Sequence, residues 1–271
     1  MDRSADLQQF YALLGRLQGR LLGTRLLAEC RGNMGWPVRG VYFFFEPGEC
    51  RSDGRPRVVR VGTHALKAGS KSTLWQRLSQ HRGTASGGGN HRGSIFRVLV
   101  GEALKRQGQY QSAISWDIGS DASKAAAQLG IPRQDVVLCE YPLEVAVSNH
   151  IRSMPFLWIG IDDDPGPDSD RGVIERNSIA LLSNYGKDAI DPPSGRWLGK
   201  HCGRERVRSS GLWNNNHVNE QYDPGFLTLL EGYVESAQRL ARLGSQTGRS
   251  RVTTGNSGPA NHIAPGKPGA M

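Results

Sequence analysis

The chain has 271 residues, of which 37% are hydrophobic, and a formal net charge of +9. This length can bury the core of one large domain or of two small ones, and no apolar run is long enough to span a membrane. The positive charge favours a polyanionic partner such as nucleic acid, although a solvated basic surface explains it equally well.

The cysteines and the start of the chain point to a reducing compartment. Four cysteines lie far apart without a CxxC pair: Cys30, Cys50, Cys139 and Cys202. This spacing argues against a zinc site and against a disulfide framework. The first residues lack the apolar stretch of a signal peptide. We therefore expect a cytoplasmic protein.

The N-terminal part of the chain predicts a helix followed by a β-hairpin. Leucines recur at helical spacing over residues 5–30, with arginines between them, which indicates an amphipathic helix. Residues 39–45 form a short apolar and aromatic run, and residues 57–62 form a β-branched run that ends in glycine; both patterns are typical of strands. Residues 46–56 between them are rich in turn formers, so the two strands are expected to pair.

The remaining elements follow from apolar periodicity and capping residues. Residues 63–73 form a polar connection to a helix over residues 74–81, which Ser72 or Thr73 can cap. Further elements are expected at helix 94–107, helix 142–153, strand 156–161, a helix from Ser169 or Asp170 to Asn184, and helix 224–243. Residues 191–219 are expected to be irregular. Residues 244–271 contain no acidic residue and are rich in Gly, Ser, Thr, Asn and Pro, which predicts a disordered basic tail.

Three side chains in the hairpin and the following helix suit chemistry on a phosphate. They are the phenol of Tyr42, the guanidinium of Arg77 and the imidazole of His81. Arg77 and His81 are four residues apart, so a helix places them on one face. A guanidinium fits phosphate, and an imidazole can transfer protons near neutral pH. Taken singly, each residue also has an ordinary structural explanation, as a strand aromatic or as part of a solvated helix face.

The order of several short motifs resembles the GIY-YIG nuclease family. The residues that carry the resemblance are Gly40-Val41-Tyr42, Arg60-Val61-Gly62, Arg77, His81, Glu175 and Asn184. It covers roughly residues 36–190, and its Arg-x3-His spacing and long insertions are most similar to the restriction-endonuclease branch. The resemblance implies an α+β fold in which helices flank a small three-stranded antiparallel sheet. An N-terminal helical segment over residues 1–35 and a C-terminal helical extension over residues 191–243 would lie outside it.

The resemblance implies a catalytic set of Tyr42, Arg77, His81, Glu175 and Asn184. Glu175 lies on a helix similar to the metal-binding helix of the family, and its carboxylate suits Mg²⁺ or Mn²⁺. Tyr42 would take a proton from the attacking water, which requires a nearby cation to lower a pKa of about 10. Arg77 would clamp the phosphate, and His81 would contact Tyr42 or the phosphate, or transfer a proton. Asn184 would fix a phosphate or orient a partner.

Arg60 departs from the family pattern, which usually has a tyrosine or a similar phenol at the start of the second strand. The expected reaction is nevertheless Mg²⁺-dependent hydrolysis of DNA phosphodiester bonds, with restriction or other defence against foreign DNA as its setting. Five basic residues are expected to contact DNA: Arg60, Lys67, Lys71, Arg82 and Arg92. Sequence specificity would lie in residues 84–92 and in the C-terminal extension.

Two other functions stay open. The Arg60 departure favours a nucleic-acid-binding module that keeps the scaffold but cleaves poorly. A basic structural or partner-binding protein would instead contact DNA weakly, without the steep salt dependence of phosphate neutralisation. Cleavage of both strands with one active site per chain would favour a homodimer.

Two weaker candidate features lie in the second half of the chain. The acidic run Asp162-Asp163-Asp164 lacks the spacing of a calcium loop and is expected to be solvated. Trp197, Trp213 and the asparagines that follow are candidates to contact DNA bases.

Overall fold

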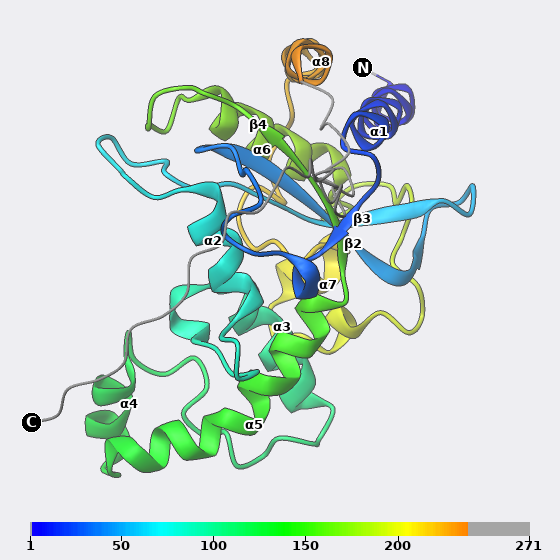
Figure 1. Cartoon of the computed structure of the whole chain (residues 1–271). Coiled ribbons are helices and arrows are strands. Elements are labelled where there is room, and N and C mark those ends of the chain that lie inside the picture. The colour runs from blue at the N-terminus through cyan, green and yellow to red at the C-terminus, as the bar shows by residue number, and fades with distance from the viewer. Residues whose placement is uncertain (1, 238–271) are drawn as a thin grey trace, which may run out of the picture. The chain divides into compact units, whose positions relative to one another are not determined.

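A computed structural model of the chain describes residues 2–237, and Figure 1 shows how their elements are arranged. The helices are α1 (Arg3–Arg20), α2 (Leu74–Arg82), α3 (Ile95–Arg106), α4 (Ala122–Leu129), α5 (Arg133–Arg152), α6 (Asp170–Leu182), α7 (Glu205–Ser210) and α8 (Gly225–Ser236). The strands are β1 (Arg25–Leu26), β2 (Gly40–Cys50), β3 (Pro56–Gly62) and β4 (Pro155–Gly160). Single 3-10 turns form η1 (Leu27–Glu29), η2 (His91–Gly93) and η3 (Leu198–His201). Within this described part, no helix is long and apolar enough to cross a membrane.

The sheet is antiparallel with the strand order β1-β4-β2-β3. The α+β class is confirmed, but the prediction of three strands is wrong, because Arg25 and Leu26 pair with β4 as a fourth, two-residue strand. The predicted helix over residues 5–30 likewise ends at Arg20. Leu22 and Gly23 adopt positive φ angles of 59° and 118°, which turn the chain out of α1 and into β1.

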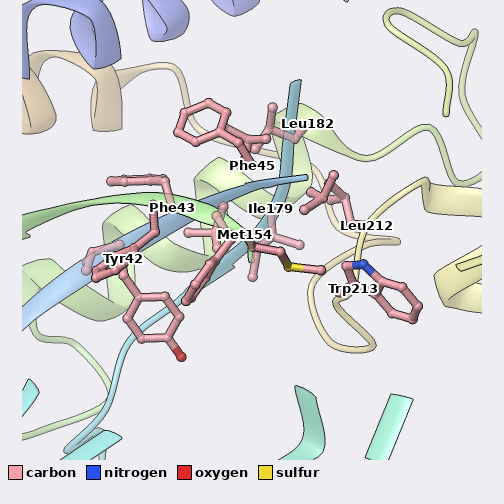
Figure 2. Packing of buried hydrophobic residues seen from close by; sticks show 14 of the residues in the cluster. Tyr42, Phe43, Phe45, Met154, Ile179, Leu182, Leu212 and Trp213 are labelled. Carbon is pink, nitrogen blue, oxygen red and sulfur yellow. The ribbon is translucent and has the colours of Figure 1, made fainter. Parts of the chain in front are cut away.

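Helices cover both faces of the sheet. Helices α1, α6 and α8 pack together on one face, and α2, α3 and α5 form the layer on the other (Figure 1). Successive side chains of a strand point to opposite faces. Phe43 therefore meets Phe10 of α1 at a ring distance of 5.8 Å, whereas Phe44 meets Phe96 of α3 at 5.5 Å. Figure 2 shows Tyr42 on the side of the sheet opposite to Phe43 and Phe45, so its phenol belongs to the α2–α3 layer.

Local capping explains the helices that were predicted well. Thr73 and Gln76 form a capping box at the start of α2, and the Ser169 hydroxyl accepts a hydrogen bond from the Gly172 N–H at the start of α6. Helix α5 begins earlier than predicted, because Pro142 lies inside it rather than at its start. Part of the segment predicted to be irregular forms η3 and α7. The end of the predicted helix 224–243 and the predicted tail 244–271 lie outside the described residues.

Residues from the predicted C-terminal extension cover the free edge of β3. The Trp213 N–H donates to the Val59 carbonyl at 2.7 Å. The side chain of Asn214 completes the edge, since its Oδ1 accepts from the Val61 N–H at 3.2 Å and its Nδ2 donates to the Val61 carbonyl at 2.9 Å. This segment therefore packs along the edge of the sheet. The domain boundaries expected at residues 35, 190 and 243 stay predictions.

The two tryptophans of this segment are not available to DNA bases. Trp197 and Trp213 are buried, and both indole N–H groups donate to Oε2 of Glu46, at 3.0 and 2.8 Å. The expectation that they contact bases is therefore wrong, and their role is to fix the segment to β2.

Candidate active site

Tyr42 is held in the α2–α3 layer by its strand register. It lies on β2 between Gly62 of β3 and Trp158 of β4 and is fully enclosed. A Cβ atom at position 62 would lie 2.3 Å from the Tyr42 hydroxyl. Residue 62 must therefore be glycine for the phenol to lie across β3, which gives the glycine of the Arg60-Val61-Gly62 motif a steric reason.

His81 joins Tyr42 to the start of α3. Its Nε2 lies 2.7 Å from the Tyr42 hydroxyl, and its Nδ1 lies 2.8 Å from Oγ of Ser94. Burial lowers the pKa of His81 well below its ordinary range, and the charges of Arg77, Arg60 and Arg97 lower it further. The imidazole is therefore uncharged at neutral pH, so one ring nitrogen donates a hydrogen bond and the other accepts one.

Arg60 is buried beside the same pair. One of its Nη groups donates to the carbonyl of Trp213, its guanidinium lies 4.7 Å from the centre of the Phe96 ring, and its Nε is buried without a partner. Burial lowers the pKa of Arg60, while the nearby Tyr42 and Glu175 oppose this shift. Arg60 was expected to contact DNA at the surface, but the structure places it inside the cluster.

Glu175 approaches the cluster from the opposite helix layer. It lies in the first half of α6, is partly exposed, and its Oε1 accepts the Thr63 N–H at 3.1 Å. Burial raises the pKa of the Glu175 carboxyl, although Arg60, His217 and the Thr63 N–H act in the opposite direction. The charges of Arg60 and Arg77 therefore act on this carboxylate.

The residues fit a loosely held divalent cation. No group of three or more His, Cys, Asp or Glu side chains in residues 2–237 could enclose a metal ion. Glu175, however, has an Oε2 that accepts no hydrogen bond from the described residues, and Mg²⁺ is often held by one carboxylate together with water and substrate phosphate. The donor set therefore suits Mg²⁺ or Mn²⁺ better than a metal that requires a complete protein cage.

Arg77 forms the solvent-facing side of the cluster. It precedes His81 by one turn of α2 and is partly exposed. Its Nη1 donates to Oε1 of Gln80 at 3.1 Å and to the carbonyl of Gly93 at 3.2 Å, while its Nε has no partner. Arg77 also lines an open hollow of about 610 Å³, so a phosphate can reach it from solvent.

Two predicted site residues are not brought to this cluster. Asn184 lies beyond the end of α6, where its Oδ1 accepts hydrogen bonds from Arg3 at 3.2 Å and from the Ile190 N–H at 3.1 Å. Arg92 donates to both carboxylate oxygens of Glu140, at 2.6 and 2.8 Å, and its side chain is buried. Both residues hold the fold together at the places where they lie.

The other basic residues expected to contact DNA lie closer to the hollow or to α2. Lys67 and Lys71 are exposed on the connection between β3 and α2. Arg82 is the last residue of α2, is partly buried, and has an Nε without a partner. All three remain free to contact a phosphate backbone.

Several residues of the site were not found from the sequence. Ser94 contacts His81, Trp213 contributes a backbone carbonyl to Arg60, and Thr63 contributes its backbone N–H to Glu175. Ser94 was detectable only as a helix cap ahead of an apolar run, and a backbone group leaves no signal in residue identity. Their roles arise from the fold.

The cluster contains a phenol, an uncharged imidazole, two guanidinium groups and one carboxylate. Guanidinium groups can bind phosphate, and a phenol in contact with an imidazole can pass on a proton, so this arrangement within an α+β fold suits chemistry on a phosphate. A family model described as the GIY-YIG domain matches residues 1–240. The chain belongs to the GIY-YIG nuclease family. No curated protein and no solved structure matches the chain.

Proposed function

We propose that this protein is a divalent-metal-dependent endonuclease that hydrolyses DNA phosphodiester bonds. The observation that carries the proposal is the Tyr42–His81 pair, joined at 2.7 Å in a buried cluster that also contains Arg60 and lies near Glu175. Hydrolysis of a phosphodiester needs a proton acceptor for water and positive charge for the phosphorane, and this group of residues supplies both.

The proton path uses the uncharged state of His81. In the arrangement that we propose, the Tyr42 hydroxyl donates to Nε2 of His81, and Nδ1–H donates to Ser94. As the attacking water loses a proton to the Tyr42 oxygen, the phenol passes its own proton to Nε2. The neighbouring guanidinium charges disfavour an imidazolium in the free protein. Burial is the larger cause of the lowered pKa of His81, and the negative charge of a bound phosphate would offset the contribution of the guanidinium groups, which makes the transfer less unfavourable when substrate is present.

Glu175 would hold Mg²⁺ or Mn²⁺, which supplies Lewis-acid charge to the scissile phosphate when it is bound. Arg77 would bind the non-bridging oxygens from the solvent side, and Arg60 would supply charge from the buried side. Asn184, whose amide is engaged with Arg3, takes no part in this proposal.

The exposed Lys67 and Lys71, together with Arg82, would contact the DNA backbone.

Restriction or other defence against foreign DNA is the proposed setting, by resemblance to the restriction branch of the family. Cutting both strands of a duplex requires two copies or two successive events, and we propose a homodimer on the DNA. The four free thiols, Cys30, Cys50, Cys139 and Cys202, agree with action in the cytoplasm.

One observation favours the second candidate function, a nucleic-acid-binding module that cleaves poorly. Tyr42 is completely enclosed, and Arg60 is only 4% exposed. A phenol that activates water must meet that water, so cleavage needs the pocket to open when DNA binds. A scaffold that has lost catalysis needs no such opening.

Supercoiled plasmid separates the two functions. Purified protein is incubated with plasmid and Mg²⁺, beside Tyr42→Phe, Glu175→Ala and an EDTA control. The proposal expects nicking or linearisation by the wild type, and a loss of at least about 100-fold in each variant and in EDTA. Discrete fragments would in addition indicate a specific target site.

Two results would count against the proposed activity. Equal cleavage by wild type and both variants would mean that the nicking arises elsewhere. Retarded migration of the plasmid without cleavage in Mg²⁺ or Mn²⁺ would favour the binding module.

A further inference from the structure

An open hollow lies beside the candidate active site, between the connection that follows β3 and the exposed side of α2. Its volume is about 610 Å³, within the usual range of ligand pockets. Its lining includes the polar side chains of Thr63, His64, Ser72, Gln76, Arg77 and Gln80. No acidic residue lines it, so the hollow is suited to an anion.

His64 lines this hollow and carries an unsatisfied buried ring nitrogen. The residue is 7% exposed, and its Nδ1 lies 3.4 Å from Oγ of Ser72, whereas its Nε2 is buried and has no partner. Burial lowers the pKa of His64 to about 4, with a further contribution from the charge of Arg171, so the ring is neutral. When Nδ1 accepts from the Ser72 hydroxyl, Nε2 carries the hydrogen. A buried ring nitrogen without a partner is rare in a folded protein, and a ligand that reaches it would satisfy it.

The backbone of this residue is fixed from behind. Arg171, which is fully buried, donates to the His64 carbonyl and pairs with Asp163. The next residue, Ala65, has a φ of 56°, in the left-handed region that non-glycine residues rarely adopt. Such strain persists only where the surroundings impose it, and it concentrates at binding sites. The backbone of His64 is thus fixed at the wall of the hollow.

The hollow shares one wall with the catalytic cluster but is not the same place. Arg77 lines it, whereas Tyr42, His81 and Glu175 do not. A phosphate bound to the cluster would therefore leave the hollow free for the adjoining part of the same strand. The exposed Lys67 and Lys71 belong to the same connection and add positive charge near its opening.

We propose that this hollow is a subsite for the nucleotide next to the cleaved bond, and that His64, whose Nε2 is enclosed in the free protein, turns its ring to donate to the phosphate of that nucleotide. The inference rests on the proposed function, because it assigns the neighbouring phosphate of the same substrate. His64 is a substrate-binding residue in this assignment, and it leaves the chemistry at Tyr42 and His81 unchanged.

Equilibrium binding tests the subsite without relying on cleavage. The fluorescence anisotropy of a labelled DNA duplex is measured in EDTA for wild type, His64→Ala and His64→Gln. The matched control is His201→Ala, an exposed histidine of η3 outside the hollow. Loss of one hydrogen bond to a phosphate is expected to raise Kd about tenfold in His64→Ala. The Gln variant keeps an N–H donor and should recover part of the affinity, whereas His201→Ala should match the wild type.

A modified substrate tests the same contact without relying on a variant. Once the cut is mapped, single methylphosphonates replace the phosphates on either side of it. Replacement of the phosphate at one of these positions should raise the KM of the wild type about tenfold. The same replacement should have little further effect on the KM of His64→Ala, because both changes remove the same contact. The kcat of the wild type on this modified substrate should stay within about threefold of its value on unmodified DNA.

The outcomes distinguish a failure of the proposed subsite from a failure of the proposed endonuclease activity. Unchanged Kd and KM in His64→Ala, or additive losses at every methylphosphonate position, would overturn the subsite even if the plasmid is cleaved. A lower affinity in His64→Ala with no cleavage by any protein would keep a phosphate contact at His64 and refute the endonuclease.

Discussion

Ser94 performs two functions with one oxygen atom. Its Oγ accepts the N–H of Arg97 at 3.3 Å, which caps α3, and it lies 2.8 Å from Nδ1 of His81. An uncharged imidazole has one hydrogen, so an acceptor at Nδ1 leaves Nε2 free to receive a proton from Tyr42. Ser94 is thus a positioning residue for the proposed proton path.

The Ser94→Ala variant should lower kcat roughly tenfold, a fraction of what a general base contributes. The variant also loses a helix cap, which costs about 1 kcal/mol in unfolding free energy. Asp121→Ala, which removes the cap of α4 far along the chain, is the matched control. Thermal melts and the pH dependence of kcat should show both variants destabilised, but only Ser94→Ala impaired and shifted in its pH profile. Equal kinetics in the two variants would exclude this role.

At the scale of elements, a buried carboxylate fixes the segment that covers β3. Glu46 of β2 accepts both indole N–H groups of Trp197 and Trp213 and lies 3.1 Å from Nε2 of His150. Trp213 in turn presents its carbonyl to Arg60. The carboxylate of Glu46 is thereby linked through Trp213 to the guanidinium of Arg60 in the candidate active site.

Lowering the pH should weaken the attachment of the Trp197–Trp213 segment to Glu46. Burial alone would raise the pKa of Glu46, but His150, Trp213 and Trp197 outweigh it and lower the pKa from 4.5. A lowered pKa in the folded state means that the carboxylate contributes stability above the ordinary pKa. That contribution is lost as the pH falls through the lowered value.

The Glu46→Gln variant should therefore be destabilised by about 2 kcal/mol at neutral pH, with the difference from wild type shrinking in acid. Urea unfolding at a series of pH values measures this. Glu231→Gln removes a carboxylate from the exposed pair with Arg16 and should have little effect. A difference that stays constant with pH would contradict the assignment of the effect to the charge of Glu46.

At the scale of the whole molecule, much of the arginine content is used internally. Buried arginines form ion pairs with acidic partners: Arg51, Arg57, Arg92, Arg97 and Arg171. Each such pair is neutral, so the net charge of +9 is carried by other basic residues. Charge that is not used in ion pairs is what a polyanion meets.

DNA binding should accordingly depend steeply on salt. In an anisotropy titration over NaCl concentration, log K is expected to fall linearly with log salt, by about one unit of slope for each phosphate neutralised. Replacing both Lys67 and Lys71 with alanine should reduce the slope by about two. A flat salt dependence would instead favour the basic partner-binding protein.

Local patterns account for the parts of the fold that were predicted. The aromatic run of β2 and the capping residues Thr73 and Ser169 act on their immediate neighbours, so sequence reasoning finds them. Strand β1 has two residues, too few to show an alternation, and Pro142 concealed the first half of α5. The cover of β3 depends on a hydrogen bond between residues 153 positions apart, which no local pattern encodes.

The predicted site residues likewise separate into those that local patterns indicate and those that depend on contacts between distant segments. Tyr42 and His81 lie together as expected, because the resemblance ordered them along elements that were themselves predictable. Asn184 was placed with Glu175 because both were expected on one helix, but α6 ends at Leu182 and Asn184 lies beyond it, bound to Arg3 and Ile190. His64, Ser94 and Trp213 gained their roles from contacts between distant segments, so residue type alone did not identify them.

The distant cover of β3 also has a consequence during protein synthesis. Asn214 follows Val61 by 153 residues, so at ordinary rates of translation the strand waits roughly 8 to 30 seconds for the residues that cover it. During that interval its outer row of N–H and C=O groups can pair with any extended chain nearby. A product truncated before residue 213 would leave the outer edge of β3 uncovered permanently. We therefore expect such fragments to aggregate where the full-length chain does not.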